Sequence, residues 1–258
     1  MKETILITND DGIHAEGIQM LCQALFPPPK GLRYELLVVA PNHEQSAVGH
    51  AITMHRPLRA EKVRFLHNPG LEGWSVNGTP SDCVKLAVEA ILSEKPRLVI
   101  SGINNGSNLG TDVLYSGTVS AAVEGIILGV PAVAVSLSNG DDFSYAADFV
   151  RRLLPHVLHT EFPSGTLFNI NVPGNRRVKG ARATTLGRRK YRNAFERRTD
   201  PRGRVYYWLA GELVEEKGIE GTDVQADRDG YISITPVHFN LTNNAFLPEL
   251  KKIVERLS

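Results

Sequence analysis

The chain has 258 residues, of which 42% are hydrophobic and 22% charged, with a formal net charge of +1. These values are ordinary for a globular protein, so they exclude a disordered or fibrous chain and allow one large α/β domain with an appended segment. The N-terminus lacks the zones of a signal peptide, and no apolar run approaches the ~20 residues of a membrane span, which predicts a cytoplasmic protein with no membrane partner. Cys22 and Cys83 lie in helix-like apolar patterns and predict buried free thiols.

Four short apolar runs are unbroken rather than alternating, which favours strands buried on both faces of a parallel sheet. They cover residues 5–7, 36–40, 98–100 and 132–135. Apolar stripes with helical spacing separate or follow them, at residues 18–25, 84–91, 119–126 and 149–154, and Thr79-Pro80 provides a cap and first-turn pair for the second. Strands that alternate with helices imply right-handed crossovers. We therefore predict a Rossmann-like α/β fold, an open and mostly parallel sheet with helices on both faces.

The sequence changes character after residue 173. Residues 205–209 and 231–234 have the pattern of strands in a hairpin-rich region, and residues 201–203 supply turn chemistry beside the first of them. A last helix is predicted over residues 247–257.

This C-terminal region is also strongly basic. Residues 176–204 hold twelve Lys or Arg residues and two acidic ones, a net charge of +10, so the rest of the chain carries about −9. Such a segment attracts phosphorylated compounds, but charge runs more often serve solubility, and we favour a solvated hairpin. We predict a Rossmann-like metal- and phosphate-binding domain over residues 1–173. Residues 174–258 are then a basic hairpin arm, with C-terminal strands and a helix, that packs on this domain or on another subunit.

Polar residues follow three of the predicted strands at the points where those strands end. Asp10 and Asp11 follow the first strand, Ser46 lies beyond the second, and Asn104 follows the third. Ligands of an open parallel sheet bind outside the carboxyl ends of its strands, so these loops should meet at one crevice.

The adjacent carboxylates of Asp10 and Asp11 repel each other and lose hydration at the end of a buried strand, so a shared proton, a basic side chain or a metal must compensate. Asn9, Ser46 and Asn104 offer neutral oxygens, and oxygen ligands of this kind suit a hard cation such as Mg²⁺ or Mn²⁺. The alternative is a simple turn, because Asp-Gly is a common turn pair.

A glycine-rich loop at residues 101–110, with Gly106 and Asn108, allows the backbone to approach a ligand closely. Ser116, Gly117 and Thr118 then begin a helix, whose N-terminus suits a phosphate. The alternative for this turn is N-capping by Ser116 or Thr118, which does not exclude phosphate binding. Neither segment matches a Walker A lysine loop or a dinucleotide-binding fingerprint, which disfavours an NTPase or a dehydrogenase.

The sequence resembles the SurE family of nucleotidases over most of the chain. Many ordered segments carry the resemblance, and together they are highly specific. They lie at residues 8–12, 40–46, 77–83, 101–104, 115–118, 169–173, 221–223 and 230–236.

The resemblance implies a Rossmann-like domain, a C-terminal region that exchanges elements between subunits, and a homodimer or homotetramer. It implies hydrolysis of nucleoside 5′- and 3′-monophosphates, sometimes of short polyphosphate, with one Mg²⁺ or Mn²⁺ per subunit. Carried over by position, the metal ligands are Asp10, Asp11, Ser46 and Asn104. Asn42 and Asn105 depart from the usual family residues, an Asp and a small residue, and leave substrate preference open. The expected phosphate- and substrate-binding residues are Asn9, Gly106, Asn108, Ser116, Gly117 and Thr118.

The mechanistic hypothesis is metal-assisted phosphoryl transfer to water, with Asp10, Asp11 and Asn104 as catalytic residues. The sequence does not exclude an alternative mechanism with an aspartyl-phosphate intermediate. Two other functions would also fit parts of the sequence. A receiver-like signalling domain would need an Asp at the end of a later strand, where this chain has Ser101 and Asn104. A nucleotide- or RNA-binding protein would use the basic arm without catalysis, although no stable nucleic-acid partner is expected.

Overall fold

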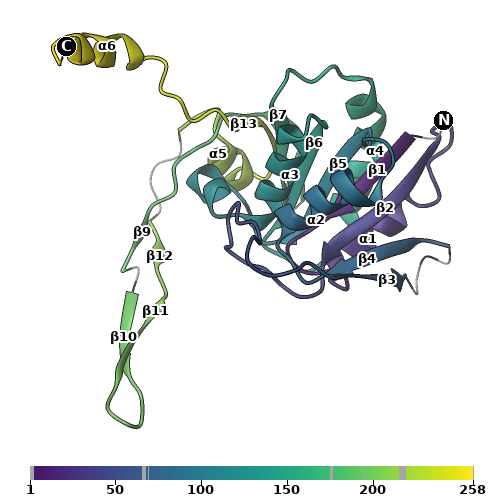
Figure 1. Cartoon of the computed structure of the whole chain (residues 1–258), viewed down its shortest axis with the longest axis horizontal. Coiled ribbons are helices and arrows are strands. Elements are labelled where there is room, and N and C mark those ends of the chain that lie inside the picture. Colours follow the sequence, from purple (N-terminus) through teal and green to yellow (C-terminus); the bar gives the residue numbers. More distant parts are fainter. Residues whose placement is uncertain are drawn as a thin grey trace.

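The computed structural model describes residues 3–257 except 66, 67, 69, 175, 176, 194 and 215–218, so Arg176 of the basic segment lies outside the described residues. Within these residues, the centre of the fold is a nine-stranded sheet with the order β3-β4-β2-β1-β5-β6-β7-β13-β8 (Figure 1). Its strands are β1 (Glu3–Thr8), β2 (Tyr34–Pro41), β3 (Ala60–Arg64), β4 (Glu72–Val76), β5 (Leu98–Asn105), β6 (Ala132–Ser138), β7 (Thr166–Pro173), β8 (Ala181–Ala183) and β13 (Ile232–His238). Within this order, the strands β4, β2, β1, β5, β6 and β7 run parallel to one another. On one side β3 pairs antiparallel with β4, and on the other side β13 pairs antiparallel with β7.

Helices cover both faces of this sheet, as the sequence predicts (Figure 1). One face carries α1 (Glu16–Leu25) and α4 (Ser144–His159), and the other carries α2 (Pro80–Leu86), the π-helical turn η1 (Ala87–Ile91) and α3 (Gly117–Ile127). Successive side chains of a strand point to opposite faces. Ile5 and Ile7 of β1 therefore belong to the core under α1 and α4, while Leu6 belongs to the core under α2 and α3. All three side chains are fully buried, which explains why the strand shows no polar alternation.

The start of α2 fastens a loop that leads to the crevice. Thr79 caps the helix, because its hydroxyl accepts from the backbone N–H of Asp82 at 3.1 Å and Asp82 Oδ2 accepts from the Thr79 N–H at 2.9 Å. Pro80 occupies the first turn, so the predicted cap and first-turn pair is confirmed. The second carboxylate oxygen of Asp82 accepts from the Thr53 N–H at 2.9 Å, which ties the loop after β2 to the helix.

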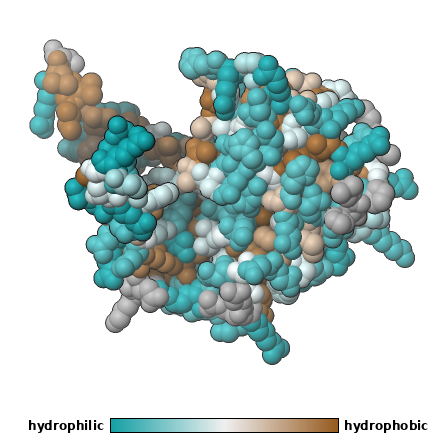
Figure 2. All heavy atoms as spheres, turned by 90° about the horizontal axis from the view of Figure 1, so that it is seen from below, coloured by the Kyte–Doolittle hydropathy of each residue, from teal (hydrophilic) through white to brown (hydrophobic). Residues whose placement is uncertain are grey.

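The hairpin arm projects from the sheet domain, and the last helix, α6, projects from the same domain in another direction (Figure 1). The arm consists of β9 (Tyr191–Arg192), β10 (Phe195–Thr199), β11 (Val205–Leu209) and β12 (Glu212–Leu213), and the predicted turn at residues 201–203 joins β10 to β11. The last helix is α6 (Leu247–Glu255). Figure 2 shows hydrophobic surface on this helix at the upper left. None of the helices in the described part of the chain is both long and apolar enough to cross a membrane.

One element of the C-terminal region was assigned wrongly from sequence. The segment at 231–234 was predicted to belong to the hairpin region, but β13 lies in the central sheet between β7 and β8. Its buried side chains, such as Ile232 and Ser233, pack against the sheet core instead of an exposed hairpin. The helix α5 (Asp223–Arg228) precedes β13 and packs beside it. The division at residue 173 stays a prediction, since β8 and β13 extend the sheet beyond it. Cys22 and Cys83 are buried and free, as predicted.

Candidate active site

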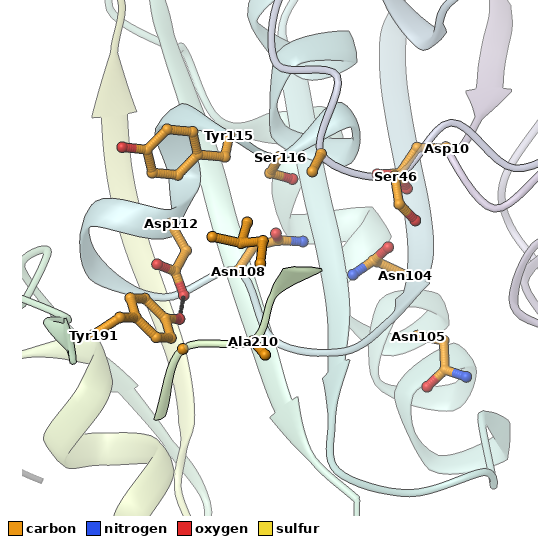
Figure 3. Close-up of a pocket in the computed structure, with 13 residues that line it drawn as sticks. Asp10, Ser46, Asn104, Asn105, Asn108, Asp112, Tyr115, Ser116, Tyr191 and Ala210 are labelled. Atoms are coloured by element: carbon orange, nitrogen blue, oxygen red, sulfur yellow. Dashed lines mark hydrogen bonds between the residues drawn. The ribbon is translucent and has the colours of Figure 1, made fainter. Parts of the chain in front are cut away.

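A cavity of about 770 Å³ opens at the carboxyl ends of β1 and β5, where the first turn of α3 and the loop after β2 also arrive (Figure 3). The predicted residues Asp10, Ser46, Asn104, Asn108 and Ser116 line it. The remaining lining residues are Ala47, Asn105, Asp112, Tyr115, Tyr191, Leu209, Ala210 and Gly211.

Asp10 is the most deeply placed acid of this cavity, with 5% of its surface exposed. Its Oδ2 accepts from the backbone N–H of Thr118 at 2.9 Å, and its Oδ1 accepts from the Thr118 hydroxyl. Burial raises the pKa of Asp10 to about 6, the hydrogen bonds from Thr118 oppose this rise, and the charge of Asp11 adds to it. The N-terminus of α3 thus orients a carboxylate that is costly to ionise without a further positive partner.

Asp11 joins the ends of two neighbouring strands. Its Oδ2 accepts from the backbone N–H of Asn105, at the end of β5, at 3.0 Å. Burial raises the pKa of Asp11, and the nearby charge of Glu44 raises it further, while the hydrogen bond from Asn105 lowers it. The acidic pair therefore lies at the β1–β5 junction, which is the central crevice of the sheet.

Ser46 and Asn104 bring neutral oxygens to the same region. The Ser46 loop is held by the Gln45 N–H, which donates to the Asp10 carbonyl at 2.8 Å, and the Ser46 hydroxyl donates to Glu44 at 2.5 Å. The Asn104 amide nitrogen donates to the Gly106 carbonyl at 2.7 Å, which directs its side-chain oxygen to the opposite side. Figure 3 shows this oxygen on the side of Ser46 and Asp10.

The donor set fits a divalent cation. Two carboxylates, a hydroxyl and an amide oxygen are the ligands that Mg²⁺ or Mn²⁺ takes in proteins. No salt bridge formed by the described residues reaches Asp10 or Asp11, so among these residues no basic side chain compensates the pair. The described part of the chain also holds no cluster of three or more His, Cys, Asp or Glu side chains with metal-binding geometry. A cation here would consequently depend on neutral oxygens such as those of Ser46 and Asn104.

The turn at Ser116, Gly117 and Thr118, which was predicted to bind phosphate, holds the Asp10 side chain in this structure. Thr118 uses both its backbone N–H and its hydroxyl on Asp10, and Ser116 caps α3 by accepting from the Val119 N–H at 3.0 Å. A Cβ added at Gly117 would lie 2.8 Å from the Cβ and 2.8 Å from Oδ2 of Asp10. Position 117 therefore requires glycine, because the Asp10 side chain lies too close to leave room for a Cβ. The N-capping alternative holds for Ser116, whose side chain nevertheless lines the cavity.

Two other predicted residues, Asn108 and Asn9, are fixed by hydrogen bonds to the backbone and side chains around the cavity. Asn108 donates its N–H to Asn171 Oδ1 and its side-chain Nδ2 to Ser136 Oγ, each at 2.8 Å, and its carbonyl accepts from Asn169 Nδ2 at 2.8 Å. This network explains the two asparagines of β7. Elsewhere, buried Asn9 donates to the Gly12 carbonyl at 2.8 Å and shapes the turn after β1.

Gly106 has a φ of +115°, in the region that favours glycine. Its N–H donates to the Leu137 carbonyl at 3.0 Å, and its carbonyl accepts from the Asn104 side chain. Gly106 therefore shapes the loop that follows β5 and orients the Asn104 amide.

The arm brings Tyr191 to the wall of the cavity that faces Asp10. The sequence allows this ring to stack on a base or on a partner subunit and favours subunit packing, and it gives no sign of Asp112 or of residues 209–211 in this wall. Asp112 lies in the 3₁₀ helix η2 (Gly110–Leu114), and its Oδ2 accepts from the Tyr191 hydroxyl at 2.7 Å and from Arg189 Nη1 at 2.8 Å. Tyr115 follows directly. Its position before Ser116 was a usable signal, whereas residues 209–211 come from the returning side of the arm hairpin, far along the chain from Asp10.

The loop after β2 is also fastened to α3. His50 Nε2 lies 2.8 Å from Glu124 Oε2, and Lys85 Nζ lies 3.0 Å from Glu124 Oε1. Glu124 is buried, and these partners lower its pKa against the opposing effect of burial. The Gly49 N–H donates to the Tyr115 carbonyl at 3.0 Å, which adds a second attachment. The loop that carries Ser46 is therefore tied to the same helix that orients Asp10.

The fold and the crevice define a Rossmann-like α/β protein with a polar site at the carboxyl edge of its sheet. Residues 5–193 match the family model of the survival protein SurE, and the chain belongs to the SurE family. It is 53% identical to the 5′-nucleotidase SurE of Carboxydothermus hydrogenoformans over 98% of this chain and 97% of that protein. It is 52% identical to the 5′-nucleotidase SurE of Alkaliphilus metalliredigens over 96% and 98% of the two chains. The crystal structure of the SurE protein from Aquifex aeolicus superposes with a TM-score of 0.81, at 38% identity over 97% of this chain and 99% of that one.

Proposed function

We propose that this protein is a divalent-metal-dependent 5′-nucleotidase, a phosphoric monoester hydrolase acting on nucleoside 5′-monophosphates. Relatives that share about half of their residues with the full chain are named 5′-nucleotidases, which supports the activity. The single observation that carries the proposal is the buried Asp10 carboxylate, which faces the cavity with neutral oxygen donors around it and no basic partner among the described residues.

The metal ligands in this proposal are Asp10, Asp11, Ser46 and Asn104, with one Mg²⁺ or Mn²⁺ per subunit. When bound, the cation offsets the negative charge of the acidic pair and of the phosphoryl group. Thr118 keeps the Asp10 carboxylate directed into the cavity by its two hydrogen bonds.

The chain's own groups then bind the phosphate and move one proton. Ser116 lines the cavity on the side of Asp10, and its hydroxyl donates to a phosphoryl oxygen. A carboxylate oxygen of Asp10 or Asp11 orients the attacking water and accepts its proton. The sheet and α3 exclude bulk water behind the acids, because Thr8 and Thr118 are fully buried.

The experiment is phosphate release from AMP, measured with Mg²⁺, with Mn²⁺ and with excess chelator. We expect the chelator to abolish turnover and the substitution Asp10→Asn to lower kcat by more than about 1,000-fold with the fold intact. Asp141→Asn, in an exposed loop acid, is the matched control and should retain wild-type activity. Near-normal turnover by Asp10→Asn in Mn²⁺ would refute the assignment.

Phosphate-release assays also test two related questions: whether other phosphorylated compounds are substrates, and whether the protein binds nucleotides without catalysis. We propose that 3′-nucleotides and short polyphosphate are additional substrates, and phosphate release from each tests this directly. A nucleotide- or RNA-binding protein without catalysis would instead show binding with a steep salt dependence and no phosphate release.

We also propose a homodimer or homotetramer that uses the C-terminal region. No residue of α6 is buried, and its apolar side chains include the exposed Leu247, Leu250, Ile253 and Val254. A helix with an apolar stripe of this kind requires a partner surface to cover it. Light scattering after size exclusion should give at least twice the 28.3 kDa chain mass, and Ile253→Asp should lower it. A monomeric wild-type protein at micromolar concentration would refute this part.

A further inference from the structure

The cavity is much larger than a phosphate site requires. Its volume of about 770 Å³ lies in the range of sites for small organic ligands. Asp10, Ser46 and Asn104 occupy one side of it, and Figure 3 shows Tyr115, Asp112 and Tyr191 together on the opposite side. A second group of the substrate, distinct from its phosphate, therefore has room beside the two tyrosines.

The arm is fixed against this side by several contacts. Asp112 Oδ2 accepts from both Tyr191 and Arg189, and the side chains of Asp112 and Arg189 are only 15% and 17% exposed. The Thr111 hydroxyl donates to the Arg189 carbonyl at 3.1 Å. Below them, buried Asp223 accepts from the Gly110 N–H at 2.8 Å and from the Gly187 N–H at 2.7 Å. The ring of Tyr191 is thus held in place.

The chemistry of this side suits an aromatic, uncharged group. The guanidinium of Arg189 is paired with Asp112, so it is not a free charge for a second phosphate. Tyr115 and Tyr191 remain 65% and 49% exposed, and Leu209 adds apolar surface from the arm. Burial and the neighbouring Asp112 carboxylate raise the pKa of Tyr191, which keeps its phenol protonated as a donor to that carboxylate. Exposed tyrosine rings offer stacking faces to any nucleobase.

We propose that Tyr115 and Tyr191 form the nucleobase subsite of this cavity, and that Asp112 is the positioning residue that holds Tyr191 there. The inference rests on the proposed nucleotidase function and deepens it, because it assigns the recognition of the base to residues of η2 and of the arm. The arm then contributes to substrate selection in addition to any role between subunits. Specificity for nucleotides over other phosphomonoesters arises on this side of the cavity.

The test compares AMP with ribose 5-phosphate, which has the same phosphoester but no base. Tyr115→Leu and Tyr191→Leu should each raise KM for AMP by about 5- to 150-fold, the loss expected from one stacking contact, with little change in kcat. The kcat/KM for ribose 5-phosphate should change less than about twofold. Tyr191→Phe keeps the ring but loses the hydrogen bond to Asp112, so it should raise KM for AMP less than Tyr191→Leu and less than Asp112→Ala, in which the Arg189 contact is lost as well. Phe195→Ala, in an exposed ring farther out on the arm, is the matched control and should leave both substrates unchanged.

Asp112→Ala should reproduce the effect of Tyr191→Leu on KM for AMP and spare ribose 5-phosphate. An equal loss on both substrates in the tyrosine variants would overturn the proposal, since it would indicate damage to the phosphate side. Unchanged KM for AMP would overturn it as well. If the wild type releases no phosphate, the nucleotidase proposal fails, and calorimetric binding of AMP to the same variants decides the subsite separately: weakened binding supports it and unchanged binding overturns it.

Discussion

Replacing Asp10 by asparagine should stabilise the metal-free protein while it removes activity. The Asp10 side chain is buried, and its pKa rises from an ordinary 3.8 to about 6. The folded protein therefore keeps this proton up to about pH 6, whereas the unfolded chain loses it near 3.8. Stability falls as the pH rises through that interval and stays lower above it. At 1.36 kcal/mol per pH unit, the ionised carboxylate costs about 3 kcal/mol of folding free energy at pH 7.

Asparagine removes this charge at the expense of one hydrogen bond. Asp10 accepts twice from Thr118, and the amide of an asparagine offers only one oxygen acceptor. A lost hydrogen bond costs about 0.5–1.5 kcal/mol, or more if a donor is left unpaired. The expected net effect is a gain of about 1–2 kcal/mol at pH 7 in chelator, measured by urea unfolding. Asp141→Asn, an exposed acid, should change stability by less than about 0.5 kcal/mol.

Two further measurements separate this reasoning from a nonspecific effect. The stability advantage of Asp10→Asn over the wild type should disappear as the pH falls below about 4, because the cost of the charge is then absent and only the lost hydrogen bond remains. Added Mg²⁺ or Mn²⁺ at 100 times its Kd should stabilise the wild type by about 2.7 kcal/mol and the variant much less. A variant that is less stable than the wild type at pH 7 in chelator would show that Asp10 is not the strained acid of the site.

Three other substitutions test the supports of the site. Gly117→Ala places a methyl group 2.8 Å from Asp10 Cβ, so kcat should fall about 100-fold with unchanged circular dichroism, and full activity would contradict the close approach. Glu124→Gln should cost about 1–3 kcal/mol in urea unfolding at pH 7. Because its histidine and lysine partners lower the pKa of Glu124, that difference should shrink, not grow, as the pH falls below the ordinary 4.5. Asp223→Ala removes the acceptor for the N–H groups of Gly110, Gly187 and Val224 and should cost at least about 2 kcal/mol; no loss in unfolding free energy would contradict a stabilising role for Asp223.

The sheet domain was predictable because its strands are buried on both faces. An unbroken apolar run such as that of β1 carries this information locally, and the sequence order of strands and helices then restricts the topology. The strand β13 was misplaced because its pairing with β7 depends on contacts between segments more than 60 residues apart, and nothing within residues 232–238 specifies the partner. Local pattern predicts that a strand exists but not which edge of a sheet it joins.

The meeting of Asp10, Asp11 and Asn104 at one edge of the sheet was predictable for a related reason. Asp10 and Asp11 follow β1, and Asn104 lies at the carboxyl end of the adjacent β5, so the rule that parallel strands end at one edge brings them together. No such rule applies to the arm. Tyr191 is held at the cavity by a hydrogen bond from its hydroxyl to Asp112, 79 residues earlier, and a basic hairpin gives no local indication of which surface it will pack against.

The energetics of the sheet edge argue that it is built for a ligand more than for stability. Beneath Asp10, the buried oxygens Thr8 Oγ1, Asn9 Oδ1 and Ser101 Oγ have no hydrogen-bond partner within the described residues, although Thr8 and Ser101 lie in register on adjacent strands. An unpaired buried polar atom costs about 1–3 kcal/mol. Several such atoms beside a buried, ionisable carboxylate form a region that folding alone would not favour. The dense hydrogen bonding around it, from Thr118 to Asp10 and from β7 to Asn108, keeps this costly arrangement in place, as the proposed binding of a cation and a phosphate requires.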